Sequence, residues 1–317
     1  MATTNDSRSD VGMSVFGILP VAFCIKRKPI IIMRSSRRQF FRRPFGGLFE
    51  SISRRSGDMR FGLVTYLWGR DWDLPTLIRN CQDTGIEGVE LRTEHAHGVE
   101  IHLSAAERAA VQAQFMDSDV VLVGLGTNWS FHHTEAAQQA HAISQAKASI
   151  VLAHDVGASG VKVKPDALPD GTPEEQTIAQ IGRALRALGQ FGEDYGQEIR
   201  LEVHGYRTDE LPVVRQIMEA ASHHNVRVCW NCNEADLNEP GLTHNFDLVR
   251  GYFGETVHIR ELDGAAYPYK QLFELLVESE YAGWILLEAR TDPPDRISAL
   301  RHQRSLFDAL LRLYEKD

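Results

Sequence analysis

The feature that most constrains this chain is a regular alternation of short apolar, β-prone segments with helical segments after residue 58. Eight such strand–helix units in about 260 residues match the size of an eightfold barrel of parallel strands. The sequence therefore predicts an α/β protein, a single-domain (β/α)8 TIM barrel over residues 59–317. The predicted strands cover residues 60–67, 88–92, 120–126, 161–164, 199–204, 226–233, 256–261 and 284–290.

A doubly wound open sheet would also alternate, but it usually carries a glycine-rich phosphate loop after an early strand. Here the first strand runs directly into Thr65, Tyr66, Leu67 and Trp68, without such a loop. A closed barrel is therefore favoured. One helix start is marked clearly, because Ser104 is followed three residues later by Glu107, the spacing of a capping box.

Residues 1–58 form a basic segment without a convincing strand or helix pattern. The stretch from Ser36 to Arg42 resembles a twin-arginine export motif, but Pro44 and Glu50 interrupt the apolar run that should follow. Three interpretations stay open: a degenerate export signal, a poorly ordered extension, or an upstream region included by a misplaced start. We favour a dispensable extension and a cytoplasmic protein, with export as the alternative.

The charge distribution argues against nucleic acid as a partner. Residues 1–58 contain 11 Lys and Arg against four Asp and Glu, which leaves 23 basic and 39 acidic residues for the rest of the chain. An acidic body repels a phosphate backbone. The apolar run 15–25 is too short to cross a bilayer, so no stable membrane insertion is expected. Barrels of this kind often pair through outer helices, and a homo-oligomer is an open expectation.

Polar side chains recur at the carboxyl ends of the predicted strands with a spacing of two, which directs them toward the barrel mouth. Because unpaired buried charges cost several kcal/mol each, six strands ending this way indicate a site where the charges compensate one another. The pairs are Glu90 and Arg92, Lys162 and Lys164, Glu202 and His204, Asn231 and Asn233, His258 and Arg260, and Glu288 and Arg290.

Four of these residues, from four consecutive strands, form a mixed oxygen and nitrogen set: Glu202, Asn231, His258 and Glu288. Two carboxylates, an imidazole and an amide oxygen suit one divalent ion such as Mn²⁺, Mg²⁺, Co²⁺ or Zn²⁺. Cys229 and Cys232 also spell C-x-x-C, but within a strand their sulfurs should face opposite sides. We therefore expect no shared metal at the cysteines.

The order of these motifs resembles the xylose isomerase-like TIM-barrel superfamily, which includes sugar isomerases, epimerases, dehydratases and endonuclease IV. The resemblance lies in residues 88–92 (GVELR), 201–204 (LEVH), 257–261 (VHIRE) and 285–288 (ILLE). It implies a metal bound by Glu202, Asn231, His258 and Glu288. Asn231 stands where the family has aspartate, and no histidine follows closely, so the metal should be held less tightly or be more electropositive.

The resemblance also implies a sugar or polyol isomerase or epimerase that acts by proton transfer through an enediolate, with Glu202 and Glu288 as the catalytic pair. A dehydratase or lyase using the same site is the alternative, and a non-catalytic sugar-binding barrel is a weaker one. Endonuclease chemistry fits poorly because it needs several metals and many histidines. The residues expected to contact a small carbohydrate substrate are Glu90, Lys164, His204, Arg260, Trp68 and His97.

Overall fold

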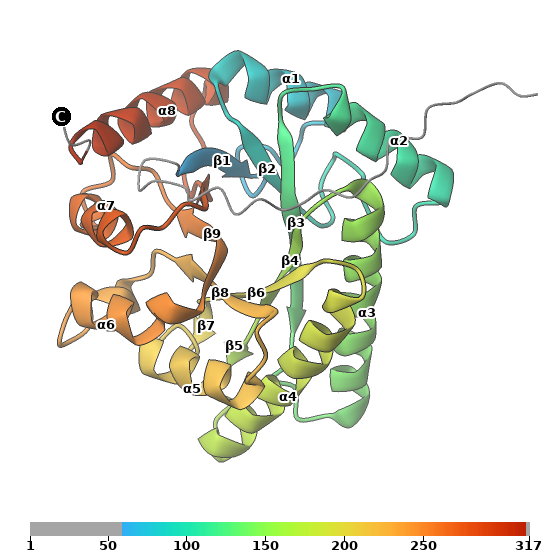
Figure 1. Cartoon of the computed structure of the whole chain (residues 1–317), viewed down its shortest axis with the longest axis vertical. Coiled ribbons are helices and arrows are strands. Elements are labelled where there is room, and N and C mark those ends of the chain that lie inside the picture. Colours follow the sequence, from blue (N-terminus) through green and yellow to red (C-terminus); the bar gives the residue numbers. More distant parts are fainter. Residues whose placement is uncertain (1–58, 315–317) are drawn as a thin grey trace, which may run out of the picture. The chain divides into compact units, whose positions relative to one another are not determined.

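The computed structural model describes residues 59–314, and they form a closed barrel of parallel strands (Figure 1). The strands follow one another around the barrel in the order β1, β10, β9, β8, β6, β4, β3, β2. The prediction of a (β/α)8 barrel is therefore confirmed. The barrel strands are β1 (Arg60–Val64), β2 (Gly88–Arg92), β3 (Val121–Ser130), β4 (Gly160–Lys164), β6 (Glu198–Glu202), β8 (Val226–Asn231), β9 (Phe253–Ile259) and β10 (Trp284–Leu287).

Eight α-helices surround the strands, and Figure 1 shows them in chain order around the ring. They are α1 (Leu74–Thr84), α2 (Ala105–Met116), α3 (Ala136–Val156), α4 (Glu174–Glu193), α5 (Leu211–Ala221), α6 (Leu242–Val249), α7 (Tyr269–Glu278) and α8 (Arg296–Arg312). Two short 3₁₀ helices, η1 (Glu234–Leu237) and η2 (Arg250–Tyr252), follow β8 and α6.

Local sequence signals fix the ends of several helices. The predicted capping box is present at α2, where the Ser104 side chain accepts from the Glu107 amide and Glu107 bonds back to Ser104. Helix α1 begins at Asp73, whose carboxylate accepts from the Thr76 amide, and ends at Gly85 in the left-handed conformation. These caps determine where the chain turns back toward the next strand.

The barrel interior changes character along its axis. A small apolar cluster of Val64, Val123, Trp284 and Leu286 fills part of it, whereas the larger apolar core, with residues such as Leu77, lies in another cluster. Above the inner cluster the inward side chains are charged or polar. Polar side chains therefore gather at the carboxyl ends of the strands, where the candidate site residues lie.

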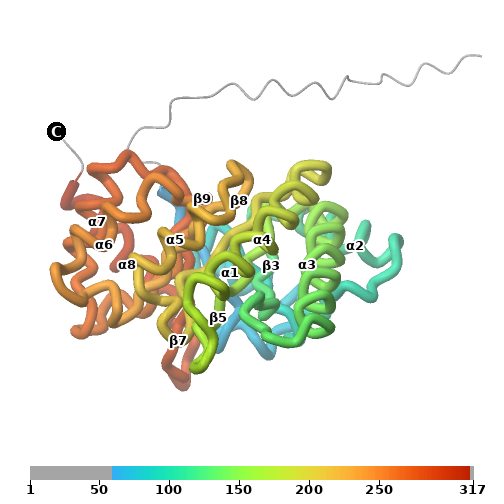
Figure 2. The backbone as a smooth tube through the Cα atoms, turned by 90° about the horizontal axis from the view of Figure 1, so that it is seen from below, coloured from blue at the N-terminus to red at the C-terminus, as the bar shows by residue number. Residues whose placement is uncertain are grey.

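Two very short strands were not predicted. They are β5 (Asp166–Ala167), after β4, and β7 (Gly205–Tyr206), after β6, and they pair in parallel as a separate ribbon. Figure 2 shows β5 and β7 together at the lower edge of the barrel. The ribbon extends the wall of the barrel mouth beyond these two strands.

The twin-arginine motif and the rest of residues 1–58 lie outside the described residues, so the interpretations of that segment stay predictions. Within residues 59–314, no helix is long and apolar enough to cross a membrane.

Candidate metal centre

Three of the four predicted metal ligands converge in the upper half of the barrel. One side-chain ligand atom from each of Glu202, His258 and Glu288 lies within 4.8 Å of the other two. Nδ1 of His258 is 3.7 Å from Oε1 of Glu202. The fourth, Asn231, comes from β8 and donates from Nδ2 to the same Glu202 oxygen at 2.9 Å. All four side chains are buried.

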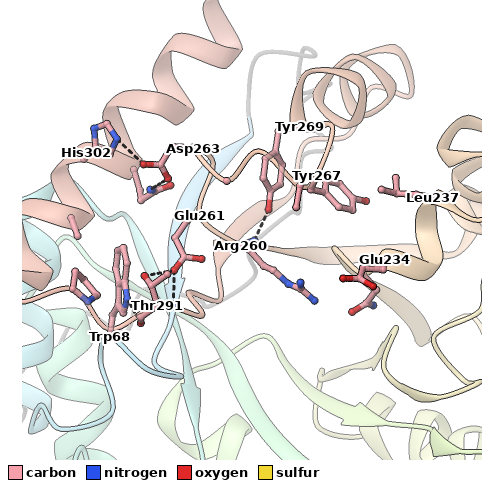
Figure 3. A pocket seen from close by; sticks show the side chains of 16 residues that line it. Trp68, Glu234, Leu237, Arg260, Glu261, Asp263, Tyr267, Tyr269, Thr291 and His302 are labelled. Carbon is pink, nitrogen blue, oxygen red and sulfur yellow. Dashed lines mark hydrogen bonds and ion pairs between the residues drawn. The ribbon is translucent and has the colours of Figure 1, made fainter.

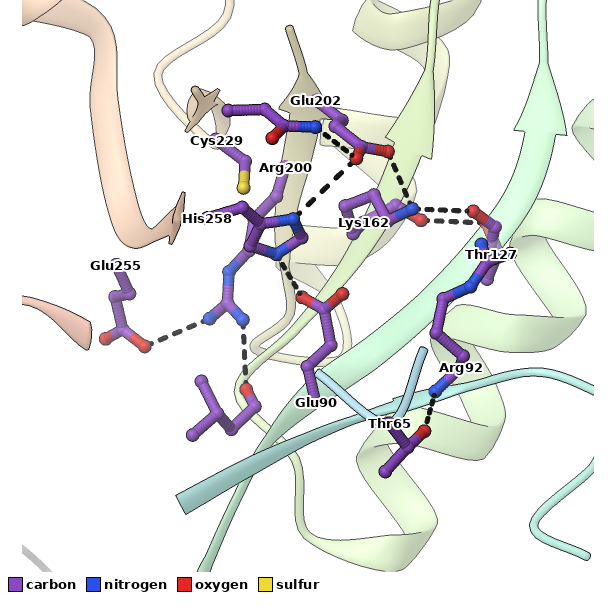
Figure 4. Close-up of polar contacts among 12 residues, drawn as sticks. Thr65, Glu90, Arg92, Thr127, Lys162, Arg200, Glu202, Cys229, Glu255 and His258 are labelled. Carbon is purple, nitrogen blue, oxygen red and sulfur yellow. Dashed lines mark hydrogen bonds and ion pairs between the residues drawn. The ribbon is translucent and has the colours of Figure 1, made fainter. Parts of the chain in front are cut away.

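Glu202 is held by a buried ion pair (Figure 4). Nζ of Lys162, from β4, lies 2.7 Å from Oε2 of Glu202 and also donates to the Thr127 carbonyl at 3.2 Å. Burial alone would raise the pKa of Glu202, but the neighbouring charges, that of Lys162 first, outweigh it and hold that pKa well below its usual range. Glu202 is therefore an ionised carboxylate, as a metal ligand must be.

Glu90 lies behind the imidazole of His258 and not at the mouth. Its Oε2 is 3.4 Å from Nε2 of His258, and both side chains are fully buried. The space for it comes from Gly126 on β3, because a Cβ there would lie 2.6 Å from Oε1 of Glu90. A carboxylate on the far nitrogen of a metal-binding histidine orients the ring. We expected Glu90 to contact the substrate, whereas in the structure its carboxylate contacts the imidazole of His258.

The donor atoms fit a divalent cation. Oδ1 of Asn231 and Nδ1 of His258 are buried and have no hydrogen-bond partner among the described residues. Native proteins rarely leave such atoms unpaired without a functional reason. Ligands held at about 2.0–2.2 Å from one ion lie roughly 3–4 Å apart, which agrees with the 3.7 Å between His258 and Glu202.

We expect Glu90→Gln to weaken metal binding by about 10–100-fold, because an amide orients the His258 ring less well and removes a charge that makes it a stronger ligand. Chelator competition on the purified variant measures this affinity. The matched control is Glu87→Gln, since Glu87 pairs with Arg304 on α8 and does not contact His258. Equal affinities in both variants would contradict the positioning role.

The profile of the xylose isomerase-like TIM barrel family matches residues 78–310. The chain belongs to this family. No curated protein matched it in sequence. Among solved structures, 3-keto-D-glucoside 4-epimerase of E. coli is 17% identical, with a TM-score of 0.67, and the match covers 80% of this chain and 99% of that one.

Two further structures resemble this xylose isomerase-like barrel at the level of the fold. L-ribulose 3-epimerase is 15% identical, with a TM-score of 0.69 and coverage of 80% of this chain and 95% of the other. The IOLI protein with a bound zinc atom is 14% identical, with a TM-score of 0.68 and coverage of 82% and 100%. At these identities the likeness establishes the fold alone.

Lys164 and His204 face each other at the mouth of this xylose isomerase-like barrel. Nζ of Lys164 donates to Nε2 of His204 at 3.5 Å and lies 4.0 Å from Glu202. The other ring nitrogen of His204 is 3.3 Å from Asp166 on β5. Both residues are partly exposed, as substrate contacts must be.

His97 does not present a free ring nitrogen. Nδ1 accepts from the Val99 amide at 3.1 Å, and Nε2 donates to the Arg92 carbonyl at 2.7 Å. Burial lowers the pKa of His97 to about 4, so the ring is neutral. The structure therefore gives His97 a role in holding its loop, in place of the expected substrate contact. Trp68 is nearly buried and donates from its indole nitrogen to the Thr291 carbonyl at 2.9 Å.

The sequence did not indicate a second charged cluster, beneath the metal centre. Arg200 on β6 is fully buried and bonds to Glu198 at 2.9 Å, Glu255 at 3.0 Å and the Val123 carbonyl at 2.9 Å (Figure 4). A Cβ on Gly124 would lie 2.7 Å from its guanidinium. Gly124 and Gly126, two residues apart in β3, could have indicated this cluster, because a glycine within a strand often marks the close approach of another group.

Cys229, within β8, and Cys232, directly after it, lie in different surroundings. Cys229 adjoins His258, whereas Cys232 adjoins Tyr267 and Asp236. Both are buried free thiols.

Proposed function

We propose that this chain is a metal-dependent isomerase or epimerase of a keto-sugar or polyol, with Glu202, Asn231, His258 and Glu288 holding one Mn, Mg, Co or Zn ion. The observation that carries the proposal is the buried group of Glu202, His258 and Glu288, with Glu90 behind the imidazole. A binding protein for neutral sugars has no need of two inward carboxylates and a carboxylate-oriented histidine.

A divalent cation at this place would act as a Lewis acid on a carbonyl and a neighbouring hydroxyl and make the adjacent C–H bond more acidic. The protein must then remove and return one proton. Glu288 is the more accessible carboxylate, with 7% of its side chain exposed and Arg290 at 3.5 Å. Glu202 carries the ion pair with Lys162. We assign proton removal and return to these two carboxylates, on either side of the carbon.

The remaining mouth residues would orient the substrate. Lys164 and His204 stand at the ribbon side of the mouth and can bind hydroxyl groups. The nearly buried Trp68 contributes an apolar wall. These roles require only that the sugar lies above the metal centre.

The test combines elemental analysis with solvent exchange on the full chain. We expect about one equivalent of a divalent metal, and metal-dependent incorporation of deuterium from D₂O into a keto-sugar such as D-fructose or L-ribulose, followed by mass spectrometry. Exchange accompanied by loss of water would assign the site to a dehydratase instead. No bound metal after supplementation, or no exchange with any keto-sugar, would refute the isomerase proposal.

A further inference from the structure

A pocket of about 430 Å³ is lined by Arg260, which follows the proposed metal ligand His258 by two residues (Figure 3). It lies between the segments that follow β8, β9 and β10 and the side of α8. Its wall is largely apolar and aromatic, formed by Trp68, Leu237, Tyr267, Tyr269 and Ala299. None of the four proposed metal ligands lines this pocket, so a group bound in it would be a different part of the substrate from the part at the metal centre.

Most polar groups in the pocket wall are already used by the protein. Glu261 accepts from the amide and hydroxyl of Thr291 at 2.8 and 2.6 Å. Asp263 contacts His302 at 3.1 Å and accepts from Gln303 at 2.9 Å. These groups hold the loops together and offer a ligand little further binding capacity.

Arg260 is different. It follows His258 by two residues, directly after the end of β9, so its side chain starts one layer nearer the mouth. Its amide donates to the hydroxyl of Tyr269 at 3.0 Å, which fixes the backbone. Nε is buried without a partner, and within residues 59–314 the guanidinium makes no hydrogen bond or ion pair. Figure 3 shows it projecting into the open space of the pocket.

The nearby acids do not neutralise this guanidinium. Figure 3 shows Glu234 on the facing side of the pocket, but it is exposed, and among the described residues no ion pair joins it to Arg260. Asp236 is buried, accepts from the Tyr267 hydroxyl at 2.6 Å and from the Asn233 amide at 2.9 Å. Burial raises the pKa of Asp236 to about 7, so it carries only part of a negative charge at neutral pH.

The other cations at the mouth already have partners. Lys162 pairs with Glu202, Lys164 donates to His204 at 3.5 Å, and Arg290 lies 3.5 Å from Glu288. Arg92 donates to Asn128 at 2.7 Å, although its Nε is also buried without a partner. A divalent ion at the metal centre would engage Glu202 and Glu288 as well. Arg260 therefore remains a positively charged, fork-shaped donor with buried, unmet hydrogen-bonding capacity, which is the geometry that binds carboxylate and phosphate groups.

We propose that the substrate is an anionic sugar derivative whose carboxylate or phosphate is bound by Arg260 in this pocket, while its hydroxyl-bearing part lies at the metal centre. The inference rests on the proposed function only for the contact between the hydroxyl-bearing part and the metal centre. The contact between Arg260 and an anion can be measured separately, as equilibrium binding without turnover.

Three ligands with the same six-carbon chain form the test: D-gluconate, D-glucitol 6-phosphate and neutral D-glucitol. Calorimetric titration of the full-length, metal-loaded protein should show one anionic ligand binding at least about tenfold more tightly than D-glucitol. The ligand that gains more identifies carboxylate or phosphate as the anion. Arg260→Met and the milder Arg260→Gln should both lose this preference.

The matched control is Arg296→Met. Arg296 is a cation at the start of α8, but it is paired with Asp71 at 3.1 Å and Asp292 at 3.0 Å. It should keep the preference, which separates a direct contact from the general charge of the mouth. Glu234→Gln should leave the preference unchanged or increase it, because a carboxylate facing Arg260 is removed.

Equal binding of all three ligands by the parent protein would overturn the inference, and so would a preference that survives Arg260→Met. Repeating the titration with Glu288→Gln, which should lack the metal, separates this failure from failure of the proposed function. The preference should persist there, since Arg260 is intact. If the protein catalysed solvent exchange into a neutral keto-sugar and bound anionic and neutral ligands equally well, the isomerase proposal would be supported and the anion site refuted.

Discussion

Glu288→Gln is expected to remove the metal and to slow solvent exchange into a keto-sugar by about 100–10,000-fold, the usual contribution of a general acid or base. Glutamine keeps the shape of the side chain but loses its charge and its ability to carry the proton. The group is held loosely, with Arg290 at 3.5 Å, so the fold should be little affected. Elemental analysis, deuterium incorporation and a thermal melt measure the three effects.

The control for this substitution is Glu219→Gln, which makes the same change on the exposed face of α5, where Glu219 pairs with Arg215. Metal content and exchange should equal those of the parent protein. If Glu288→Gln retained a full equivalent of metal and normal exchange, Glu288 would be neither ligand nor base, and the assigned catalytic pair would be wrong.

Lys162→Met is expected to lower the free energy of unfolding by about 3–5 kcal/mol, because it leaves Glu202 buried and without its partner. The pair is 2.7 Å long and both side chains are essentially inaccessible to solvent. The double variant Lys162→Met with Glu202→Gln should recover part of the loss, since it removes the unpaired charge. Denaturant unfolding of the metal-free proteins measures all three values.

Saturating metal should reduce the deficit of Lys162→Met, because a cation bound to Glu202 takes over the compensation that Lys162 provides. Lys270→Met, on exposed α7, is the control and should change stability by less than about 0.5 kcal/mol. If Lys162→Met lowered the free energy of unfolding by less than about 1 kcal/mol, water would be compensating the charge of Glu202. The cluster would then be more hydrated than its burial indicates.

The sequence was sufficient for the barrel because its signals are repeated eight times. Each strand and helix is a weak indication by itself, but only a closed parallel barrel accommodates all of them in this length. The two-residue strands β5 and β7 escaped prediction because their pairing depends on two loops meeting in space. A two-residue segment has no periodicity to detect.

The residues of the candidate metal centre could be proposed from the sequence, but their contacts with one another could not. Alternation tells which side chains point into a barrel, but it does not tell how deep they lie. Depth depends on the stagger between strands, for example the register that places Glu90 beside Gly124 and Val64. Glu90 was therefore predicted at the mouth although it lies beneath His258. The partner of Lys162 was missed for the same reason.

Loop residues were the hardest to assign. The residue type of His97 and its position after a barrel strand suit a substrate contact. In the structure, both of its ring nitrogens bond to backbone groups nearby in the chain. Nothing in the sequence distinguishes these two situations, because the conformation of the loop decides them. Trp68 lines the pocket, and its contact with the Thr291 carbonyl joins segments more than 200 residues apart.

The contact between Gly124 and Arg200 limits how this sequence can diverge. A Cβ at position 124 or 160 would lie 2.7 Å from the guanidinium, and loss of the guanidinium would leave the partly buried Glu198 without its ion-pair partner. A substitution at any one of these positions therefore carries a penalty, and a compensated change involves more than one of them. Buried charges inside a barrel thus couple substitutions on strands that are far apart in the sequence.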